Sequence, residues 1–336
     1  MSRQNNFDLV RLVLGLVVVG QHLRDLTNVQ SIATLFGSFS GLFAVQGFFV
    51  LSGFLIFQSF ERSKGLKDYA EKRVRRVYPG YVASVLVFFV LCGLTSTFST
   101  LDLLRNGHTW KYLIANLSFL NFLQDILPGV FYNQLFQSVN GALWTIKVEV
   151  MFYVLVPVMA ALVRRFNSHW ALVSLFVLSC AYRWYFTAVH PSEVMVRQLP
   201  GQLQYFCVGG WLYYNLAWFL KQGWWLFGVA VVGLALVQFG GEITVRPIVV
   251  GLLVMFVGFR APYLGNWSRF GDFSYGVYIV HFPIIQLLVH AGLFARQPAL
   301  GLGLTLLLVF MAAWLSWHLV EKRFLLQSSH YLAGKS

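Results

Sequence analysis

The sequence has few charged residues and few cysteines for its length. Only 11% of its 336 residues are charged, whereas 58% are hydrophobic. Its three cysteines lie inside apolar stretches, so we expect neither a disulfide framework nor a cysteine metal site. Polar stretches are too short for a second, soluble domain, and several apolar stretches approach the roughly 20 residues that cross a bilayer. We therefore predict an all-α polytopic membrane protein that forms a single domain, residues 1–336.

Apolar stretches between charged residues, glycines and prolines predict ten membrane spans. These are residues 8–27, 36–59, 79–97, 143–163, 169–188, 201–220, 223–240, 247–260, 272–292 and 298–319. A further segment, residues 111–126, is short and carries three amide side chains, so we expect it to lie at the interface or to re-enter the membrane. The first span contains an arginine, and no small-residue cleavage pattern follows it, so we predict a retained helix rather than a signal peptide.

The distribution of basic residues predicts the orientation, because cytoplasmic loops are enriched in lysine and arginine. With ten spans and the N-terminus inside, the inner loops and termini hold sixteen of the 25 lysines and arginines. The outer loops hold six, which are Arg24, Arg105, Lys111, Arg197, Arg246 and Arg296. If residues 111–126 also crossed the membrane, every later loop would change sides. We therefore expect ten spans with both termini in the cytoplasm.

The densest group of charges is the predicted cytoplasmic segment ERSKGLKDYAEKRVRRVYP, residues 61–79. Its basic residues could simply reflect a cytoplasmic location and attract anionic lipids. It could equally form a phosphate-binding site, because arginine matches phosphate with two parallel hydrogen bonds. The sequence leaves both interpretations open. The net charge of +13 is explained by membrane orientation, so we expect no nucleic-acid partner.

The first span carries Arg11 and His22, although a charged group inside a bilayer costs roughly 2.5 kcal/mol or more. Eleven residues make about three helical turns, so both side chains leave the same face, about 16 Å apart along the axis. Each could instead satisfy a buried polar neighbour or extend to the interface. The spacing favours a functional role in which the two side chains line one path through the membrane at two depths, with Arg11 nearer the cytoplasm.

The fourth span, within ALWTIKVEVMFY, contains Lys147 and Glu149. Counted from the span ends, Glu149 and His22 lie at similar depths, roughly 6 to 9 Å below the outer boundary. Lys147 faces away from Glu149 and is close enough to the surface to extend to water. A carboxylate that orients a histidine is typical of general-base or nucleophilic catalysis, so we predict His22 and Glu149 as the catalytic residues.

At these residues the sequence resembles the acyltransferase-3 family, integral membrane acyltransferases typified by bacterial polysaccharide O-acetylases. Arg11 and His22 match its pattern of arginine, ten residues and histidine, and GFFVLSGFLI (47–56) matches its second-helix block. RVRRVYP (73–79) is similar to its arginine hairpin, and LWTIKVEVMFY (143–153) to its Trp-Ser-Leu-x-Val-Glu segment. SYGVYIVHFPI (274–284) and VEKRF (320–324) add two further matches. Together they extend over nearly the whole chain.

The resemblance implies transfer of an acyl group, commonly acetyl from cytoplasmic acetyl-CoA, to a hydroxyl of an envelope glycan or lipid-linked saccharide. It also implies a multi-pass protein of the bacterial inner membrane, surrounded by lipid. We expect no metal and no fused esterase-like domain. The oligomeric state and the acceptor are left open.

The resemblance also assigns roles to single residues. Arg11, Arg73 and Arg76 are expected to hold the coenzyme phosphates. His22 is expected to act on the acyl group or the acceptor, with support from Glu149. Ser52 and Gly53 are assigned to the donor site, although small residues in a membrane helix also allow close packing. His281 lies among aromatic residues and is interpreted as a packing residue.

Two positions depart from the family pattern, and two other functions compete. Gln46 replaces an acidic residue before the double phenylalanine, and Lys147 replaces a small or polar one. Intramembrane arginine, histidine and glutamate would also suit a proton-coupled transporter of a small anionic or sugar-like solute. No repeated halves are visible, which favours the enzyme. A non-catalytic assembly scaffold would not need His22 and Glu149 at matched depth.

The charge distribution generates a test of topology. Single cysteines introduced at residues 128–140 should react with impermeant thiol reagents added outside intact cells. Cysteines at residues 65–68 should react only after the membrane is opened. The reverse pattern would contradict the ten-span topology and the depths calculated from it.

Overall fold

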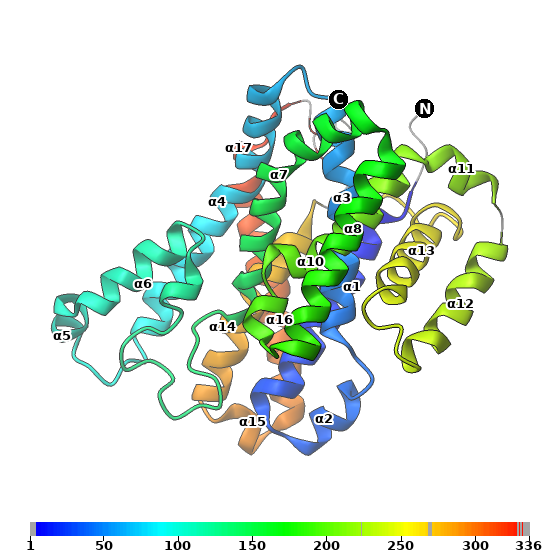
Figure 1. The fold of residues 1–336 in the computed structure, drawn as a ribbon. Coiled ribbons are helices and arrows are strands. Elements are labelled where there is room, and N and C mark those ends of the chain that lie inside the picture. The colour runs from blue at the N-terminus through cyan, green and yellow to red at the C-terminus, as the bar shows by residue number, and fades with distance from the viewer. Residues whose placement is uncertain (1–4, 223, 268–270, 328, 330, 332–336) are drawn as a thin grey trace. The chain divides into compact units, whose positions relative to one another are not determined.

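The structure, a computed structural model, describes residues 5–222, 224–267, 271–327, 329 and 331. Within these residues the regular elements are helices, and the strand-like feature is an isolated bridge between Ile126 and Ser138. The predicted all-α fold is confirmed (Figure 1). The helices are α1 (Phe7–Thr27), α2 (Gln30–Phe36), α3 (Gly41–Glu61), α4 (Leu66–Gly93), α5 (Thr100–Arg105), α6 (Gly107–Leu117), η1 (Asn121–Leu123), η2 (Gly141–Leu143), α7 (Trp144–Phe166), α8 (Ser168–Trp184), η3 (Tyr185–Val189), α9 (Glu193–Val196), α10 (Leu199–Tyr214), α11 (Leu216–Lys221), α12 (Trp225–Gln238), α13 (Val245–Phe259), α14 (Phe273–His290), α15 (Leu293–Arg296), α16 (Pro298–Leu315), η5 (Ser316–Glu321) and α17 (Lys322–Phe324).

Each predicted span coincides with at least one helix, and the multi-pass character is confirmed. Among the described residues, six helical stretches are long and apolar enough to cross a membrane. They are Gly41–Glu61, Leu66–Gly93, Gly141–Phe166, Ser168–Val189, Phe273–His290 and Pro298–Phe324. The positions of the termini relative to the membrane stay a prediction.

Helix α4 extends beyond the predicted span, which began at residue 79. The helix begins at Leu66 and continues through Pro79 to Gly93. Proline removes one backbone hydrogen bond, and membrane helices tolerate this where neighbours satisfy the freed group. As a result Arg73 and Arg76 lie on a helix, three residues apart and therefore on similar faces.

The uncertain segment at 111–126 contains α6, with eleven residues, and the single turn η1. Eleven residues extend about 17 Å, far less than the hydrocarbon thickness of about 30 Å. Helix α6 begins where the Asn106 side chain accepts a hydrogen bond from the His108 amide. The segment is therefore too short to span as a helix, in agreement with the prediction.

The chain divides into two compact units, each built from segments that are distant in sequence. Unit 1 comprises the described residues of Met1–Arg11, Leu42–Glu71 and Val148–Asn266, and unit 2 those of Leu12–Gly41, Lys72–Lys147 and Trp267–Ser336. In unit 1, α10 packs against α8 and α13. Three rings from α3, α7 and α10 form its centre: Phe152 stacks on Phe206 at 4.3 Å and meets Phe49 edge-on at 5.5 Å.

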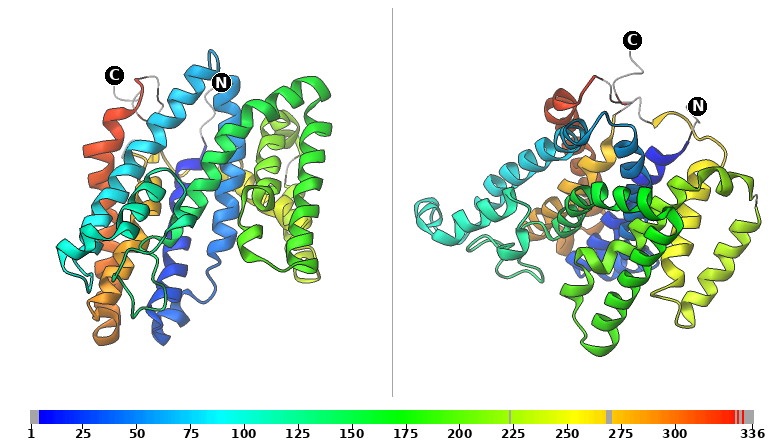
Figure 2. Two further views of the ribbon diagram at one scale, coloured as in Figure 1. Left: turned by 60° about the vertical axis from the view of Figure 1, so that its left-hand side comes forward. Right: turned by 45° about the horizontal axis from the view of Figure 1, so that its top comes forward.

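In unit 2 the central element is α14, which lies beside α16 (Figures 1 and 2). Gly276 of α14 lies against Ala313 of α16, where an added Cβ would come within 2.9 Å of the alanine backbone. On another side Tyr275 donates from its hydroxyl to the Val77 carbonyl of α4, at 2.8 Å. Because protein surrounds α14, its polar side chains can be buried away from lipid.

Two helix-internal prolines show how the backbone is satisfied. Pro157 cannot donate to the carbonyl four residues earlier, that of Tyr153, and the buried Tyr69 hydroxyl donates to it instead at 3.0 Å. Pro283 likewise frees the Ile279 carbonyl. That oxygen accepts from Asn140 Nδ2 at 2.8 Å and from Ser84 Oγ at 3.2 Å. Unsatisfied backbone groups are costly in a membrane, so these bonds are structural requirements.

Helices α12 and α16 expose large apolar side chains. Val232 of α12 and Leu307 of α16 are each 61% exposed, and similar residues line the same helices. On a water-soluble protein a surface of this kind would promote association. In a multi-pass membrane protein such a surface suits contact with lipid tails.

Glycine at position 209 generates a test of packing in unit 1. A Cβ on Gly209 of α10 would overlap the Val50 carbonyl of α3, whereas a Cβ on Gly228 of α12 would meet nothing within 4 Å. Gly209→Ala should lower the melting temperature in detergent, since overpacking costs about 1–3 kcal/mol. Gly228→Ala is the matched control and should leave it unchanged or higher, because alanine favours helix. Equal losses in both variants would contradict this packing.

Candidate functional site

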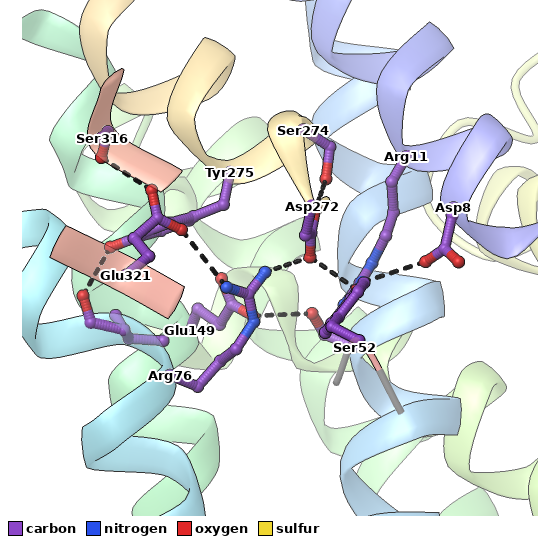
Figure 3. A network of polar contacts seen from close by, with 12 residues as sticks. Asp8, Arg11, Ser52, Arg76, Glu149, Asp272, Ser274, Tyr275, Ser316 and Glu321 are labelled. Carbon is purple, nitrogen blue, oxygen red and sulfur yellow. Dashed lines mark hydrogen bonds and ion pairs between the residues drawn. The ribbon is translucent and has the colours of Figure 1, made fainter. Parts of the chain in front are cut away.

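Glu149 of α7 is held by two hydroxyl groups within unit 1. Tyr153 Oη donates to Glu149 Oε1 at 2.6 Å. Ser52 Oγ of α3 donates to the same oxygen at 3.0 Å (Figure 3). Tyr153 follows Glu149 by four residues, so both lie on one helix face. Hydrogen bonds to a charged acceptor are stronger than neutral ones. Two predicted site residues, Ser52 and Glu149, are thus hydrogen-bonded to each other. The Ser52 hydroxyl therefore has a protein partner in addition to any donor that it contacts.

Gly53 lies where α3 approaches α10 most closely. A Cβ at this position would overlap the Phe206 carbonyl group. A glycine is therefore required here by helix packing, as small residues often are in membrane helices. Packing accounts for Gly53, and its assignment to the donor site stays a prediction.

His22 of α1 contacts a second histidine within unit 2. Its Nδ1 lies 2.8 Å from Nε2 of His281, in the middle of α14. His281 is fully buried, and its Nδ1 lies 3.2 Å from the Val277 carbonyl oxygen. The Phe282 ring meets His22 edge-on, with 5.1 Å between ring centroids. His281 thus has a polar contact with His22 in addition to its packing among aromatic rings.

Arg76 of α4 is surrounded by acidic and aromatic side chains of unit 2. Its guanidinium contacts the Asp272 carboxylate, and its Nη1 lies 3.4 Å from Glu321 Oε2 (Figure 3). The Tyr275 and Tyr331 rings lie 5.5 and 5.3 Å from its Cζ. Asp272 and Glu321 are 3% and 1% exposed, so each buried carboxylate gains a counter-charge from this arginine.

The remaining acceptor atoms of this cluster are also used. Asp272 accepts from Ser274 Oγ at 2.5 Å and from Tyr331 Oη at 2.6 Å, and Glu321 accepts from Ser316 Oγ at 2.7 Å. A buried ion pair is stable only when its other hydrogen-bonding atoms are satisfied. Arg76 therefore has a structural role in unit 2 that the sequence did not predict.

Of the other two predicted arginines, Arg73 lies on the same helix as Arg76 and Arg11 lies on α1. Arg73 is half-buried on α4, three residues before Arg76. Arg11 lies 3.9 Å from Asp8, three residues earlier on α1, and about a quarter of its side chain is exposed. Helix α1 is continuous from Phe7 to Thr27, so the predicted spacing of Arg11 and His22 along one helix is confirmed. His22 and Glu149 belong to different units, and their predicted pairing stays a prediction.

The two positions that depart from the family pattern are both buried. Lys147 is 7% exposed, and its ammonium lies 4.6 Å from the centre of the Phe122 ring. It therefore does not extend to water as predicted, and a cation–π contact takes the place of solvent. The Gln46 amide is fully buried, and neither of its polar atoms has a hydrogen-bond partner among the described residues.

Sequence reasoning missed three groups that contact predicted site residues. Tyr153 could have been found from its spacing of four residues after Glu149. His281 carried a signal, because an ionisable residue inside a span is a functional candidate. Nothing in the sequence pairs Asp272 and Glu321 with Arg76, since they lie 196 and 245 residues after it, although Glu321 belongs to the matched segment VEKRF.

Comparisons with known proteins identify the family. The family described as "Acyltransferase domain", acyltransferase-3, matches residues 4–321. The chain is 26% identical to a protein of Shigella phage Sf6 named O-acetyl transferase, over 99% of both chains. It is 24% identical to Nodulation protein 10 of Rhizobium leguminosarum bv. viciae, over 96% of this chain and 93% of that one. No solved structure matches significantly. The chain belongs to the acyltransferase-3 family of membrane acyltransferases.

Proposed function

We propose that the protein, working as one membrane domain, transfers an acetyl group from cytoplasmic acetyl-CoA to a hydroxyl of an envelope glycan or lipid-linked saccharide. The observation that carries the proposal is the family match over residues 4–321. The relative named O-acetyl transferase, which aligns over the full length, supports acetyl as the acyl group. A bacterial inner membrane would supply both the coenzyme on one side and envelope saccharides on the other.

In the proposed reaction His22 acts at the reacting atoms. Acting as a general base, it takes the proton of the acceptor hydroxyl while that oxygen attacks the thioester carbonyl. Acting as a nucleophile, it would first take the acetyl group itself. In both versions the carbon–sulfur bond of acetyl-CoA breaks and the coenzyme leaves as a thiol. Glu149 takes the supporting role that the family resemblance gives it.

The arginines divide into two kinds in this proposal. Arg73 and Arg11 bind the coenzyme phosphates, which a guanidinium can contact with two parallel hydrogen bonds. Arg76 already contacts two buried carboxylates. We therefore propose that Arg76 also holds α4 against the Asp272 and Glu321 segments, beside the phosphate binding that the family resemblance assigns to it.

His22→Ala should abolish acetyl transfer while leaving expression and acetyl-CoA binding near wild type. Loss of general-base catalysis alone costs roughly a hundredfold to ten-thousandfold in rate. Glu149→Gln should cost less, since it keeps the side-chain shape and removes the charge. His108→Ala removes an exposed histidine of α6 and is the matched control. Mass spectrometry of envelope glycans, with thermal stabilisation by acetyl-CoA in detergent, would measure both properties.

Two results would change the proposal. Wild-type acylation by His22→Ala with loss in Glu149→Gln would move the central role to Glu149. If millimolar acetyl-CoA gave no thermal stabilisation of the wild type, the transporter would become the better explanation. Incubation with donor alone separates the two chemistries, because an acetyl adduct on His22 would indicate a covalent intermediate.

Arg73→Ala and Arg76→Ala should have different effects. Arg73→Ala should raise the KM for acetyl-CoA and leave kcat near wild type, as expected when a uniform binding contact is lost. Arg76→Ala should lower the melting temperature, since breaking a buried ion pair costs about 3–5 kcal/mol. Arg75→Ala, on the exposed side of α4, is the control for charge. Equal melting temperatures for Arg76→Ala and Arg75→Ala would contradict the structural role.

A further inference from the structure

The contact between His22 and His281 has the geometry of a hydrogen bond in the plane of both rings. The ring planes are inclined by only 22°, and their centroids lie 5.0 Å apart. The nearest nitrogens are 2.8 Å apart, much closer than the centroids, so the rings meet edge to edge rather than face to face. The lone pair and the N–H bond of an imidazole both lie in its plane. One nitrogen therefore donates and the other accepts.

The Val277 carbonyl decides which nitrogen donates. A carbonyl oxygen can only accept, so His281 Nδ1, 3.2 Å away, must carry a hydrogen. His281 is fully buried, and its hydrogen-bonding partners among the described residues are the backbone of Val277 and Tyr278 and the imidazole of His22. A buried imidazolium without a carboxylate partner is costly, so the ring is neutral. Its Nε2 then has a lone pair and accepts from His22 Nδ1–H.

We propose that His281 is a positioning residue that fixes the reactive tautomer of His22, with the hydrogen on Nδ1 and the lone pair on Nε2. The inference rests on the proposed function, in which His22 acts at the reacting atoms. In neutral imidazole one nitrogen is a donor and the other an acceptor, so protonation of Nδ1 makes Nε2 the basic nitrogen. The Phe282 ring, edge-on to His22, further restricts ring rotation.

The reaction at His22 needs only acetyl-CoA and the acceptor hydroxyl. Nε2 takes the proton of the acceptor hydroxyl as the new carbon–oxygen bond forms and the carbon–sulfur bond breaks. The departing thiolate then takes that proton back from Nε2. Nδ1 keeps its hydrogen throughout and donates to His281, with a stronger bond while His22 is charged. His281 does not touch the reacting atoms.

Nitrogen NMR tests the tautomer without requiring activity. In full-length protein with ¹⁵N-labelled histidine, the His22 signals are identified by their loss in His22→Ala. At a pH where the ring is neutral, we expect a protonated Nδ1 and an unprotonated Nε2. A neutral His22 with the hydrogen on Nε2 would overturn the inference.

Two substitutions at His281 test the consequence for catalysis. His281→Leu removes the acceptor, so we expect kcat to fall about tenfold to a hundredfold, as when a partner that orients a histidine is lost. The KM for acetyl-CoA should stay near wild type. His281→Gln supplies an amide oxygen that can accept from Nδ1–H and should recover most of the activity. A structural role alone would not separate kcat from KM or predict rescue by glutamine.

The outcomes separate this inference from the proposed function. Full kcat in His281→Leu, with an active wild type, would reject the positioning role and leave the acetyltransferase proposal intact. A wild type that neither binds acetyl-CoA nor transfers acetyl would reject the proposed function, while the NMR result would still decide the tautomer. If His281→Leu does not fold, the wild-type NMR spectrum and the kinetics of His281→Gln decide whether His281 positions His22.

Discussion

The Ile279 carbonyl is the point on which the arrangement of unit 2 depends. Pro283 leaves it without its helical donor, and Asn140 and Ser84 supply two replacements. Because an unsatisfied carbonyl inside a membrane costs several kcal/mol, α14 cannot easily shift relative to the segments that bring these donors. His281 lies only two residues from this carbonyl. The same bonds that compensate for the proline therefore fix the position of the imidazole beside His22.

A neutral imidazole is an unusual but suitable partner for a histidine in this setting. A carboxylate in the same position would bring a charge into the interior of unit 2, where desolvation is expensive. His281 provides only a lone pair, which orients His22 at little cost. The partner gains importance when His22 becomes charged, because the hydrogen bond then has an ionic donor. This bond thus contributes both to orientation in the resting state and to stabilisation during the reaction, beside the supporting role proposed for Glu149.

Much of the fold follows from the sequence, because apolar length and charge distribution are local properties. The ten predicted spans each coincide with helix, and Arg11 and His22 share a helix as their spacing required. Prediction was weaker where a polar group has a tertiary partner. Lys147 was placed in water by its distance from the span end, but the Phe122 ring covers its ammonium. Depth along a helix does not reveal which loop folds over it.

The Arg76 cluster shows why the periodicity of the sequence does not predict such tertiary contacts. Glu321 ends the π-helical turn η5, where hydrogen bonds connect residues five apart rather than four. That wider turn brings Ser316 onto the same side as Glu321, and the serine hydroxyl donates to the carboxylate. With 3.6 residues per turn the two side chains would point well apart. The irregular turn thus supplies the hydrogen bond that a buried carboxylate needs beyond its arginine, and no helical period applied to the sequence would have placed it there.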